Sequence, residues 1–344
     1  MASDSDRGAR FRGLGLSLSN EEPAAATLAL VREADRLGYD EVSIPESRRH
    51  RSVTSIAAAA LATTDQVTVR IGIANPVTRH PVLLAMEAAT LADLAPGRVR
   101  FGIGAAEWTV RALGWDPQEW RPYSNTVEAV QTVKRLTAGE PLGFEPQTFR
   151  ATADTVLDLA SPEPVPVDIG AVNRRMMEAV GEVADGVQLG AITSVGYTRW
   201  AVDRIAEGAA RAGRDPASLL VTANVLTSVA DDRAAARKAV REVLAYYLFR
   251  VEGVVVDLSD ADRDAVAAVR RAVADGGVEQ GAAAVSESLI DTFAVAGTVD
   301  EVADGLLAFA DAGMHIPLLW HTLGPDPVRA VEVLAREVRP AVCT

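Results

Sequence analysis

The chain alternates between amphipathic segments and short apolar runs along almost its whole length. The first unit has apolar side chains at helical spacing between Leu30 and Leu37, then Gly38 as a left-handed stop, then the apolar run 41–45. The segments "LLAMEAATLADLAPGRVRFGIGA" and "RRMMEAVGEVADGVQLGA" repeat this scheme. The pattern predicts about eight strands, most of them followed by a helix, near residues 13–18, 41–45, 67–74, 98–104, 165–170, 186–190, 219–228 and 315–320.

Helix–strand alternation over this length indicates a parallel sheet, either a closed barrel or an open doubly wound sheet. Neither "GIGAAE" nor "GLGLSL" completes the dinucleotide-binding glycine pattern, which argues against a Rossmann fold. An eight-unit barrel needs roughly 250 residues, and longer chains carry insertions. We therefore predict an α/β protein with a (β/α)8 TIM barrel fold.

The residues beyond a minimal barrel gather in two places. Residues 140–160 are rich in Pro, Gly and Thr and fit a short hairpin, whereas residues 231–290 form a helical stretch broken at Gly276 and Gly277. No Pro- or Ser-rich linker divides the chain. We predict a disordered N-terminal segment over residues 1–10 and a single domain over residues 11–344, with insertions near 140–160 and 231–290.

Composition narrows the classes of partner. The net charge of −13 argues against nucleic acid or an anionic membrane as a partner. No apolar run reaches transmembrane length, and the first ten residues lack the apolar core of a secretory signal. The single cysteine, Cys343, excludes an intrachain disulfide. These features predict a soluble cytoplasmic protein.

Polar residues follow several of the predicted strands. In a barrel of this kind the active site lies at the C-terminal ends of the strands. Glu46 follows the second strand, the loop 74–80 the third, and Glu107 the fourth. Each glutamate has two interpretations. Glu46 is either a solvated loop carboxylate or an acceptor beside a cofactor, and Glu107 is either a first-turn helix carboxylate or an acid catalyst.

Other candidate groups are an anion site and a basic run. Asn173 caps a helix and Arg174 follows it, an arrangement that serves either ordinary capping or phosphate binding. Arg48 and Arg49 belong to "ESRRHRS", which is either a solvated face or an attractor for an anionic ligand. Gly102 and Gly104 would let a ligand approach the backbone. The four histidines lack metal-site spacing, and no nucleophile elbow is present, so metal ligation and covalent hydrolysis are disfavoured.

Several ordered motifs resemble the bacterial luciferase-like oxidoreductase family from about residue 11 to residue 320. They include "GLGLSLSNEEPAAATLALVREADRLGYDEVSIPE", "RIGIANPVTRHPVLLAMEAATLADLAPGRVRFGIGAAEW" and "AVAGTVDEVADGLLAFADAGM". The resemblance implies a (β/α)8 barrel with insertions that uses FMN or the deazaflavin coenzyme F420. The "NPVTRHP" loop looks closest to the F420-dependent branch, which includes methylenetetrahydromethanopterin reductases and sugar-phosphate or alcohol dehydrogenases.

The resemblance also implies a set of site residues. In that branch a non-prolyl cis peptide, here Gly72–Ile73, ends the third strand and backs the deazaflavin ring. Glu46 matches an acid that contacts the ring, and Glu107 matches a glutamate of proton transfer. The implied cofactor-binding residues are Glu46, Gly72, Ile73, Asn75, Gly104, Ala105, Gly170, Ala171, Val172, Asn173 and Arg174. The implied substrate or anion contacts are Arg48, Arg49, Arg79 and His80.

Two departures from the family pattern bear on the reaction. Ser47 stands where many relatives have His, which argues against any mechanism that needs a histidine there. Gly15 stands where the methanopterin reductases have Glu, which argues against that particular reaction. The resemblance thus predicts hydride transfer between F420 and a small organic substrate, with Glu107 handling the proton. One alternative is an FMN-dependent monooxygenase that uses O₂ and a separate flavin reductase, and another is a noncatalytic flavin-binding paralogue. A homodimer is expected, because family members commonly pack helices near strands two and three and "SIAAAALATT" permits close approach.

Overall fold

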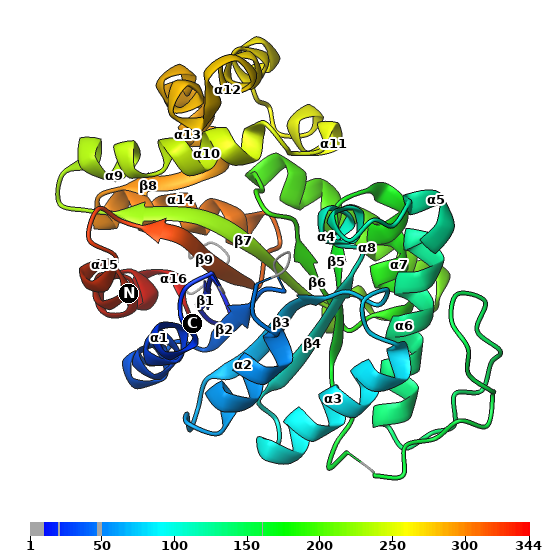
Figure 1. The fold of residues 1–344 in the computed structure, drawn as a ribbon. Coiled ribbons are helices and arrows are strands. Elements are labelled where there is room, and N and C mark those ends of the chain that lie inside the picture. Colours follow the sequence, from blue (N-terminus) through cyan, green and yellow to red (C-terminus); the bar gives the residue numbers. More distant parts are fainter. Residues whose placement is uncertain (1–9, 20, 47–49, 160) are drawn as a thin grey trace. The chain divides into compact units, whose positions relative to one another are not determined.

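The computed structural model describes residues 10–19, 21–46, 50–159 and 161–344. The segment predicted to be disordered, 1–10, lies almost wholly outside the described residues. Arg48, Arg49 and Ser47 lie outside them as well, so the expectations for these three residues stay predictions. Along the described chain, nine strands alternate with helices (Figure 1).

The chain divides into two compact units. The first unit comprises Leu18–Gln188 and Ile205–Leu220, and the second comprises Met1–Ser17, Leu189–Arg204 and Val221–Thr344. The first unit contains the strands β2 (Glu41–Ile44), β3 (Thr68–Ala74), β4 (Val99–Gly104), β5 (Val167–Ala171) and β6 (Gly186–Leu189) in this spatial order. Its helices are α1 (Ala24–Leu37), α2 (Val53–Leu61), α3 (Pro81–Leu94), α4 (Glu107–Ala112), α5 (Pro117–Trp120), α6 (Pro122–Thr137) and α7 (Arg174–Val183), with a 3₁₀ turn at Pro216–Ser218.

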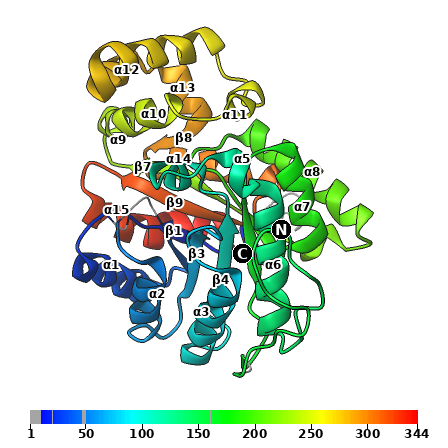
Figure 2. The ribbon, with the colours of Figure 1, turned by 45° about the vertical axis from the view of Figure 1, so that its right-hand side comes forward.

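Helices cover the outer side of the strands in the first unit. The pairs β2–β3, β3–β4 and β4–β5 are parallel. Figures 1 and 2 show α2, α3 and α6 beside β3 and β4. Gly38 ends α1 with a φ of 80°, the left-handed stop that the sequence predicts.

The second unit contains the strands β1 (Gly15–Ser17), β7 (Leu220–Val229), β8 (Ala294–Gly297) and β9 (Ile316–Leu323). Strand β9 pairs in parallel with β1 and β7, and β8 pairs in parallel with β7. Its helices are α9 (Arg233–Ala239), α10 (Arg241–Leu248), α11 (Gly253–Asp257), α12 (Arg263–Ala284), α13 (Glu287–Phe293), α14 (Val299–Asp311), α15 (Pro327–Val333) and α16 (Arg339–Val342), with a π-helical turn at Leu334–Val338. Helix α8 (Val195–Arg211) contributes residues to both units.

The predicted (β/α)8 barrel is confirmed, and all eight predicted strands are present within a few residues of the expected bounds. The ninth strand, β8, was missed because "AVAG" is too short to stand out as an apolar run. The insertion 231–290 consists of helices, and α12 kinks at Gly277, where φ is 81°. The insertion near 140–160 pairs with itself through two backbone bonds, Leu142 N to Thr155 O and Gly143 N to Ala153 O, without a strand in its described residues. The single-domain assignment stays a prediction.

A buried ion network connects four strands of the first unit. Arg70 of β3 is fully buried and pairs with Glu41 of β2 and Asp168 of β5. Arg100 of β4 also donates to Asp168, with an Nε–Oδ2 distance of 3.0 Å. Burial by itself would raise the pKa of Asp168, but the guanidinium groups of Arg100 and Arg70 hold this pKa below its ordinary value.

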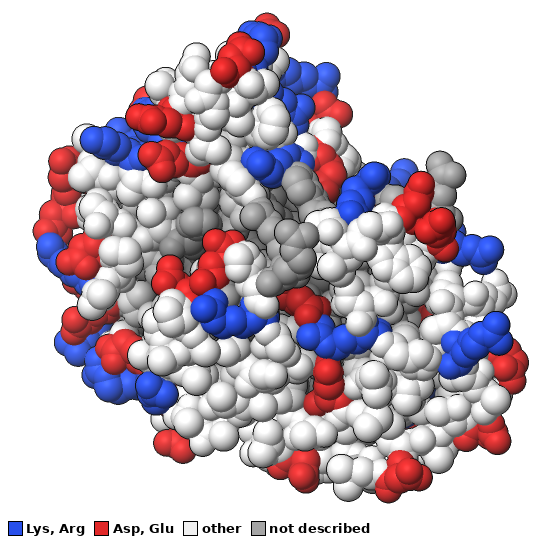
Figure 3. Space-filling view, viewed as in Figure 1, with Lys and Arg blue, Asp and Glu red and all other residues white. Residues whose placement is uncertain are grey.

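Two further observations concern the surface charge and the hydropathy of the helices. On the face drawn in Figure 3, basic side chains are scattered among acidic ones. Within the part of the chain that the structure describes, no helix combines the length and the apolar character needed to cross a bilayer.

Candidate active site

Glu46 lies just beyond β2 and is held by the loop that follows β3. Its carboxylate accepts a hydrogen bond from the Asn75 backbone N–H at 3.2 Å and forms an ion pair with Arg79. The side chains of Glu46 and Arg79 are only 13% and 19% exposed. This rules out the interpretation of Glu46 as a freely solvated loop carboxylate.

Arg79 lies between two carboxylates. Besides Glu46, its guanidinium reaches Oε1 of Glu87 on α3 at 3.4 Å. Burial raises the pKa of Glu87 above its ordinary value, although the Arg79 charge opposes the shift. The positive charge of Arg79 is therefore used within the protein, where it fixes Glu46. The sequence analysis did not select Glu87, because this residue lies inside the apolar helix "LLAMEAATL". The available signal was that Glu87 is the one charged residue of that segment.

The end of β3 has the geometry that the resemblance implied. The Gly72–Ile73 peptide bond is cis. The register between β3 and β4 shifts between Ile71 and Ala74. Gly72 and Ile73 are half-buried, whereas Ile71 and Ala74 on either side of them are buried. The strand thus ends in a small accessible surface next to Glu46 and its partner Asn75.

Three glycines of β4 and β5 make room for the Ile73 side chain. A Cβ atom placed on Gly102 or Gly104 would lie 2.8 or 2.9 Å from an Ile73 methyl carbon, and one placed on Gly170 would lie 3.2 Å from Ile73. Such distances are shorter than normal carbon–carbon contacts. The space beside Gly104 is therefore occupied by Ile73, and that beside Gly102 by Ile73 and the Ile71 carbonyl oxygen, whereas a ligand approach at these glycines stays a prediction.

Asn75 joins the ends of β3 and β4. Its buried side chain donates from Nδ2 to the carbonyl of Ala105, and its Oδ1 accepts from the backbone N–H of Val77 at 2.8 Å and of Thr78 at 3.0 Å. The last two bonds form an Asx turn that fixes the loop. The Asn75 side chain therefore links the β3–α3 loop to Ala105 after β4, and the Asn75 backbone N–H donates to Glu46.

His80 has a structural position at the start of α3. The Val82 N–H donates to His80 Nδ1 at 3.3 Å, which caps the helix. A neutral imidazole then carries its proton on Nε2, which lies 2.9 Å from the carbonyl of Arg150. The ring also packs edge-on against Phe149, with 5.1 Å between ring centroids. Both nitrogens of His80 are thus occupied by backbone groups.

Glu107 is the first residue of α4 and is exposed. Its Oε1 accepts from Arg111 Nε at 2.8 Å and from Nη2 at 2.6 Å. The preceding residue, Ala106, has a φ of 42° and a ψ of 47°, a left-handed conformation that costs an L-residue roughly 1–2 kcal/mol. Among the described residues, Glu107 and Glu46 make no contact with each other, and a shared site for the two carboxylates stays a prediction.

The loop between β5 and α7 is organised by a helix cap. Asn173 Oδ1 accepts from the Met176 N–H at 3.0 Å, as the sequence predicts. Ala171 is buried and Val172 is half-buried. The Arg174 guanidinium pairs with Glu178 at 2.7 Å and with Glu207 at 3.3 Å, so its charge is partnered along the helix flank. The N-terminus of α7 keeps the geometry of an anion site, and its use for phosphate stays a prediction.

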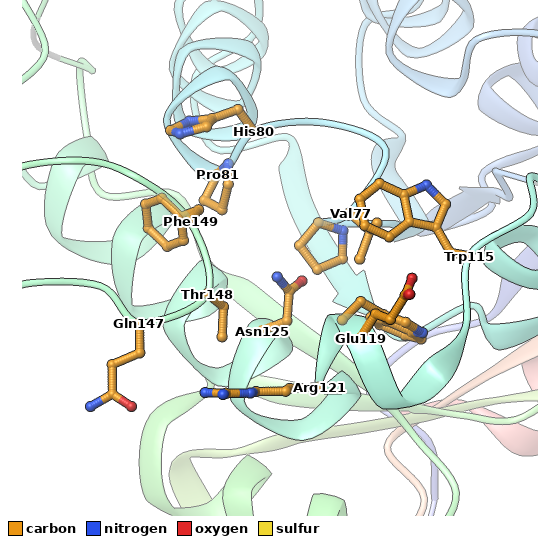
Figure 4. Close-up of a pocket in the computed structure, with 12 residues that line it drawn as sticks. Val77, His80, Pro81, Trp115, Glu119, Arg121, Asn125, Gln147, Thr148 and Phe149 are labelled. Atoms are coloured by element: carbon orange, nitrogen blue, oxygen red, sulfur yellow. The ribbon is translucent and has the colours of Figure 1, made fainter.

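A cavity lies beside the β3–α3 loop (Figure 4). Its volume is about 390 Å³, and its lining residues come from that loop, from the segment 115–125 and from the insertion: Pro76, Val77, His80, Pro81, Trp115, Glu119, Trp120, Arg121, Asn125, Gln147, Thr148 and Phe149. Of the predicted site residues, this lining includes only His80. The sequence analysis missed it, although the dense aromatic and polar content of "GWDPQEWRPYSN" was a signal. Among the described residues, no cluster of three or more His, Cys, Asp or Glu side chains has the arrangement of a metal site.

The fold and the site define a (β/α)8 barrel whose acidic loop after β2 meets a cis-peptide bulge at the end of β3. A family model described as luciferase-like monooxygenase matches residues 9–315. The chain therefore belongs to the luciferase-like monooxygenase family.

Three relatives illustrate its neighbours. The chain is 27% identical to a 5,10-methylenetetrahydromethanopterin reductase of Methanolobus tindarius, over 94% of this chain and 98% of the relative. It is 29% identical to an F420-dependent glucose-6-phosphate dehydrogenase of Beutenbergia cavernae, over 95% of this chain and 96% of the relative. The structure of a coenzyme F420-dependent tetrahydromethanopterin reductase from Methanopyrus kandleri is similar with a TM-score of 0.89 and 25% identity, covering 97% of this chain and 100% of that one.

Proposed function

We propose that the protein is an F420-dependent oxidoreductase that transfers a hydride between the deazaflavin and a small organic substrate. The supporting observation is the placement of Glu46, which Asn75 and Arg79 fix beside the half-buried end of β3. The relatives that share nearly the whole length of the chain are named as F420-dependent enzymes or as reductases of methanopterin substrates. The particular substrate class follows from neither source.

The residues of the first unit fit a flat ring with a phosphate-bearing tail. Gly72 and Ile73 offer an accessible surface at the strand end, and the glycines behind Ile73 let that side chain lie close to β4 and β5. Glu46 lies at the edge of this surface as a fixed acceptor. The first turn of α7, which Asn173 caps, has backbone N–H groups that suit the cofactor phosphate.

F420 supplies hydride exchange at C5 of its deazaflavin ring when it is bound. Glu46 orients the ring, and the pair of Asn75 and Arg79 prevents the carboxylate from turning away. We assign proton handling to Glu107. Both bonds from Arg111 go to Oε1, and in the described structure this leaves Oε2 of Glu107 to take or release a proton.

Titration of the purified protein with F420 and separately with FMN tests the proposal, with the change in cofactor fluorescence as the readout. If the proposal holds, the unmodified protein binds F420. The Glu107→Gln variant should then keep the same affinity for F420 but lose turnover. Tight binding of FMN alone would favour the FMN-dependent monooxygenase with its separate flavin reductase. Unchanged function in Glu107→Gln would favour a noncatalytic paralogue. Glu279→Gln serves as a control, because Glu279 is exposed on α12 and makes none of these contacts.

We also propose that the protein is a homodimer that packs through α3. Three large apolar side chains of this helix are exposed, namely Leu83 (49%), Met86 (51%) and Leu94 (49%). Their spacing places them along one side of the helix, where burial against a second copy would be favourable. A cytoplasmic location is part of the proposal, supported by the single free cysteine, Cys343.

A further inference from the structure

Glu87 of α3 is the second carboxylate that contacts Arg79, and one of its oxygens has no partner. Its Oε1 lies 3.4 Å from Arg79 Nε. Its Oε2 is buried and accepts no hydrogen bond from any described residue. Buried acceptors are ordinarily paired, and an unpaired charge is far more costly to bury than an unpaired neutral group. Within this cluster, Oε2 of Glu87 is therefore an atom at which a bound proton lowers the cost of burial.

The neighbouring carboxylate has no such atom. Glu46 accepts from the Asn75 N–H through Oε2, at 3.2 Å, and from Arg79 through Oε1. A proton on either oxygen of Glu46 would compete with one of these donors. Of the two carboxylates that share Arg79, Glu87 is therefore the one that accommodates a proton without loss of a contact.

The described groups that face Glu87 come from three elements. Arg79 of the β3–α3 loop and the Thr54 hydroxyl of α2 favour a negative charge on Glu87, whereas Glu46 after β2 opposes it. Burial has the largest effect, and the pKa of Glu87 lies above its ordinary value. The Glu87 side chain is still 29% exposed, so the loss of its remaining water would disfavour the charge further.

We infer that Glu87 is a positioning residue that takes up a proton when F420 binds, so that Arg79 is left to hold Glu46 alone. The inference rests on the proposed function, in which the deazaflavin ring lies on the strand end beside Glu46. A ring placed there covers Glu46 and Arg79 and removes water from the cluster, which makes the ionised form of Glu87 less favourable. The cluster of two carboxylates and one guanidinium then changes from net negative to neutral.

Proton uptake by Glu87 makes the affinity for F420 depend on pH. At a pH low enough for Glu87 to be neutral before binding, no proton has to be taken up, and the contribution of Glu87 to affinity is most favourable. As the pH rises above that range, a proton has to bind together with the cofactor, and the affinity of the unmodified chain falls. In Glu87→Gln the side chain is neutral at every pH and keeps an oxygen for Arg79, so this dependence is absent.

Fluorescence titration with F420 from about pH 5 to about pH 8 tests the inference on the unmodified chain and on Glu87→Gln. The ratio of their Kd values at each pH removes the effect of ionisations within the cofactor. We expect nearly equal Kd values at about pH 5, and binding about three- to tenfold tighter in Glu87→Gln at about pH 8. Glu279→Gln removes the same charge from an exposed position on α12, and its Kd should follow that of the unmodified chain at every pH.

Isothermal titration in buffers of different ionisation enthalpy measures the proton uptake itself. At about pH 7 the unmodified chain should take up more protons per F420 bound than Glu87→Gln does. A purely structural role of Glu87 would change the affinity by one factor at all pH values and leave proton uptake unchanged. Glu87→Met is a second neutral variant in case Glu87→Gln does not fold. Its overall affinity should be lower because Arg79 loses an acceptor, but its Kd relative to the unmodified chain should change with pH in the same way.

The outcomes separate this inference from the proposed function. If F420 binds but the Kd ratio is the same at every pH, if proton uptake is equal, or if Glu87→Gln binds more weakly at about pH 8, the inference is overturned and the proposed function stands. If the unmodified chain binds no F420 at any pH, both are overturned.

Discussion

Replacement of Arg70 by methionine should remove about 3–5 kcal/mol from the free energy of unfolding. Arg70 and Asp168 are fully buried, and Glu41 is 2% exposed. Asp168 would keep Arg100 as a partner, at an Nε–Oδ2 distance of 3.0 Å. Glu41 would keep no cation within reach among the described residues. Because a buried carboxylate without a partner is costly, the loss comes mainly from Glu41.

Chemical denaturation followed by circular dichroism measures this loss, and a second substitution tests its cause. Adding Glu41→Gln to Arg70→Met removes the uncompensated charge, so the double variant should be more stable than the single one. Arg336→Met is a matched control, because its exposed ion pair with Glu332 spans one helical turn and contributes about 0.5 kcal/mol or less. A loss below about 1 kcal/mol in Arg70→Met, or a double variant no more stable than the single one, would refute the reasoning.

The same network predicts a dependence of stability on pH. The guanidinium groups keep the pKa of Asp168 below its ordinary value of 3.8 despite burial. A carboxyl group whose pKa is lower in the folded state stabilises the fold above its unfolded pKa, and that contribution is lost as the pH falls through the folded value. Arg70→Met reduces the shift. Acid unfolding of the variant should therefore begin at a higher pH than in the unmodified protein.

Three further predictions concern separate parts of the molecule. Glu46→Gln should weaken F420 binding about tenfold, whereas Glu279→Gln should leave it unchanged in the same fluorescence titration. Burial, with a smaller contribution from nearby Arg12, lowers the pKa of His315 to about 4, so stability should fall as the pH decreases from 6.5 toward 4. His315→Asn should flatten this dependence by about 1–2 kcal/mol, a range reduced for the partial solvent exposure of the ring, and thermal melts across this pH range would contradict the assignment if both proteins lost stability equally. Met86→Glu should convert the proposed homodimer into a monomer in light scattering, and an unchanged mass would exclude α3 as the interface.

The sequence predicts the positions of eight strands, but it does not predict which side chains of neighbouring strands contact one another. Apolar runs between glycine-terminated helices located eight strands, because burial inside a barrel demands such runs. The Arg70 network depends on register, since Arg70 lies opposite Arg100 and Asp168 lies opposite Gly102. A one-residue shift in pairing would bring other residues together, and periodicity along one strand carries no information about such shifts.

The candidate active site was also predicted only in part. Strand-end position and the family resemblance together selected Glu46, Asn75 and the Gly72–Ile73 bond, and the structure brings these residues together. Neither showed that Arg79 is neutralised internally by Glu46 and Glu87, because the second carboxylate lies on a helix and is brought close only by packing. The cavity around Asn125 was not predicted for the same reason, since its walls come from three separate segments.

The glycines of β4 and β5 show how one strand end is shaped by its neighbours. Gly102, Gly104 and Gly170 were interpreted through what a ligand needs, yet the side chain that fills the space beside them is Ile73 of β3. A larger residue at Gly104 or Gly170 would meet Ile73 first and displace it, and one at Gly102 would also meet the Ile71 carbonyl oxygen, so each would disturb the half-buried surface proposed for the deazaflavin ring. The shape of that surface is therefore determined by β4 and β5 as much as by the strand that carries it. We therefore expect glycines on these strands to affect cofactor binding through the position of Ile73.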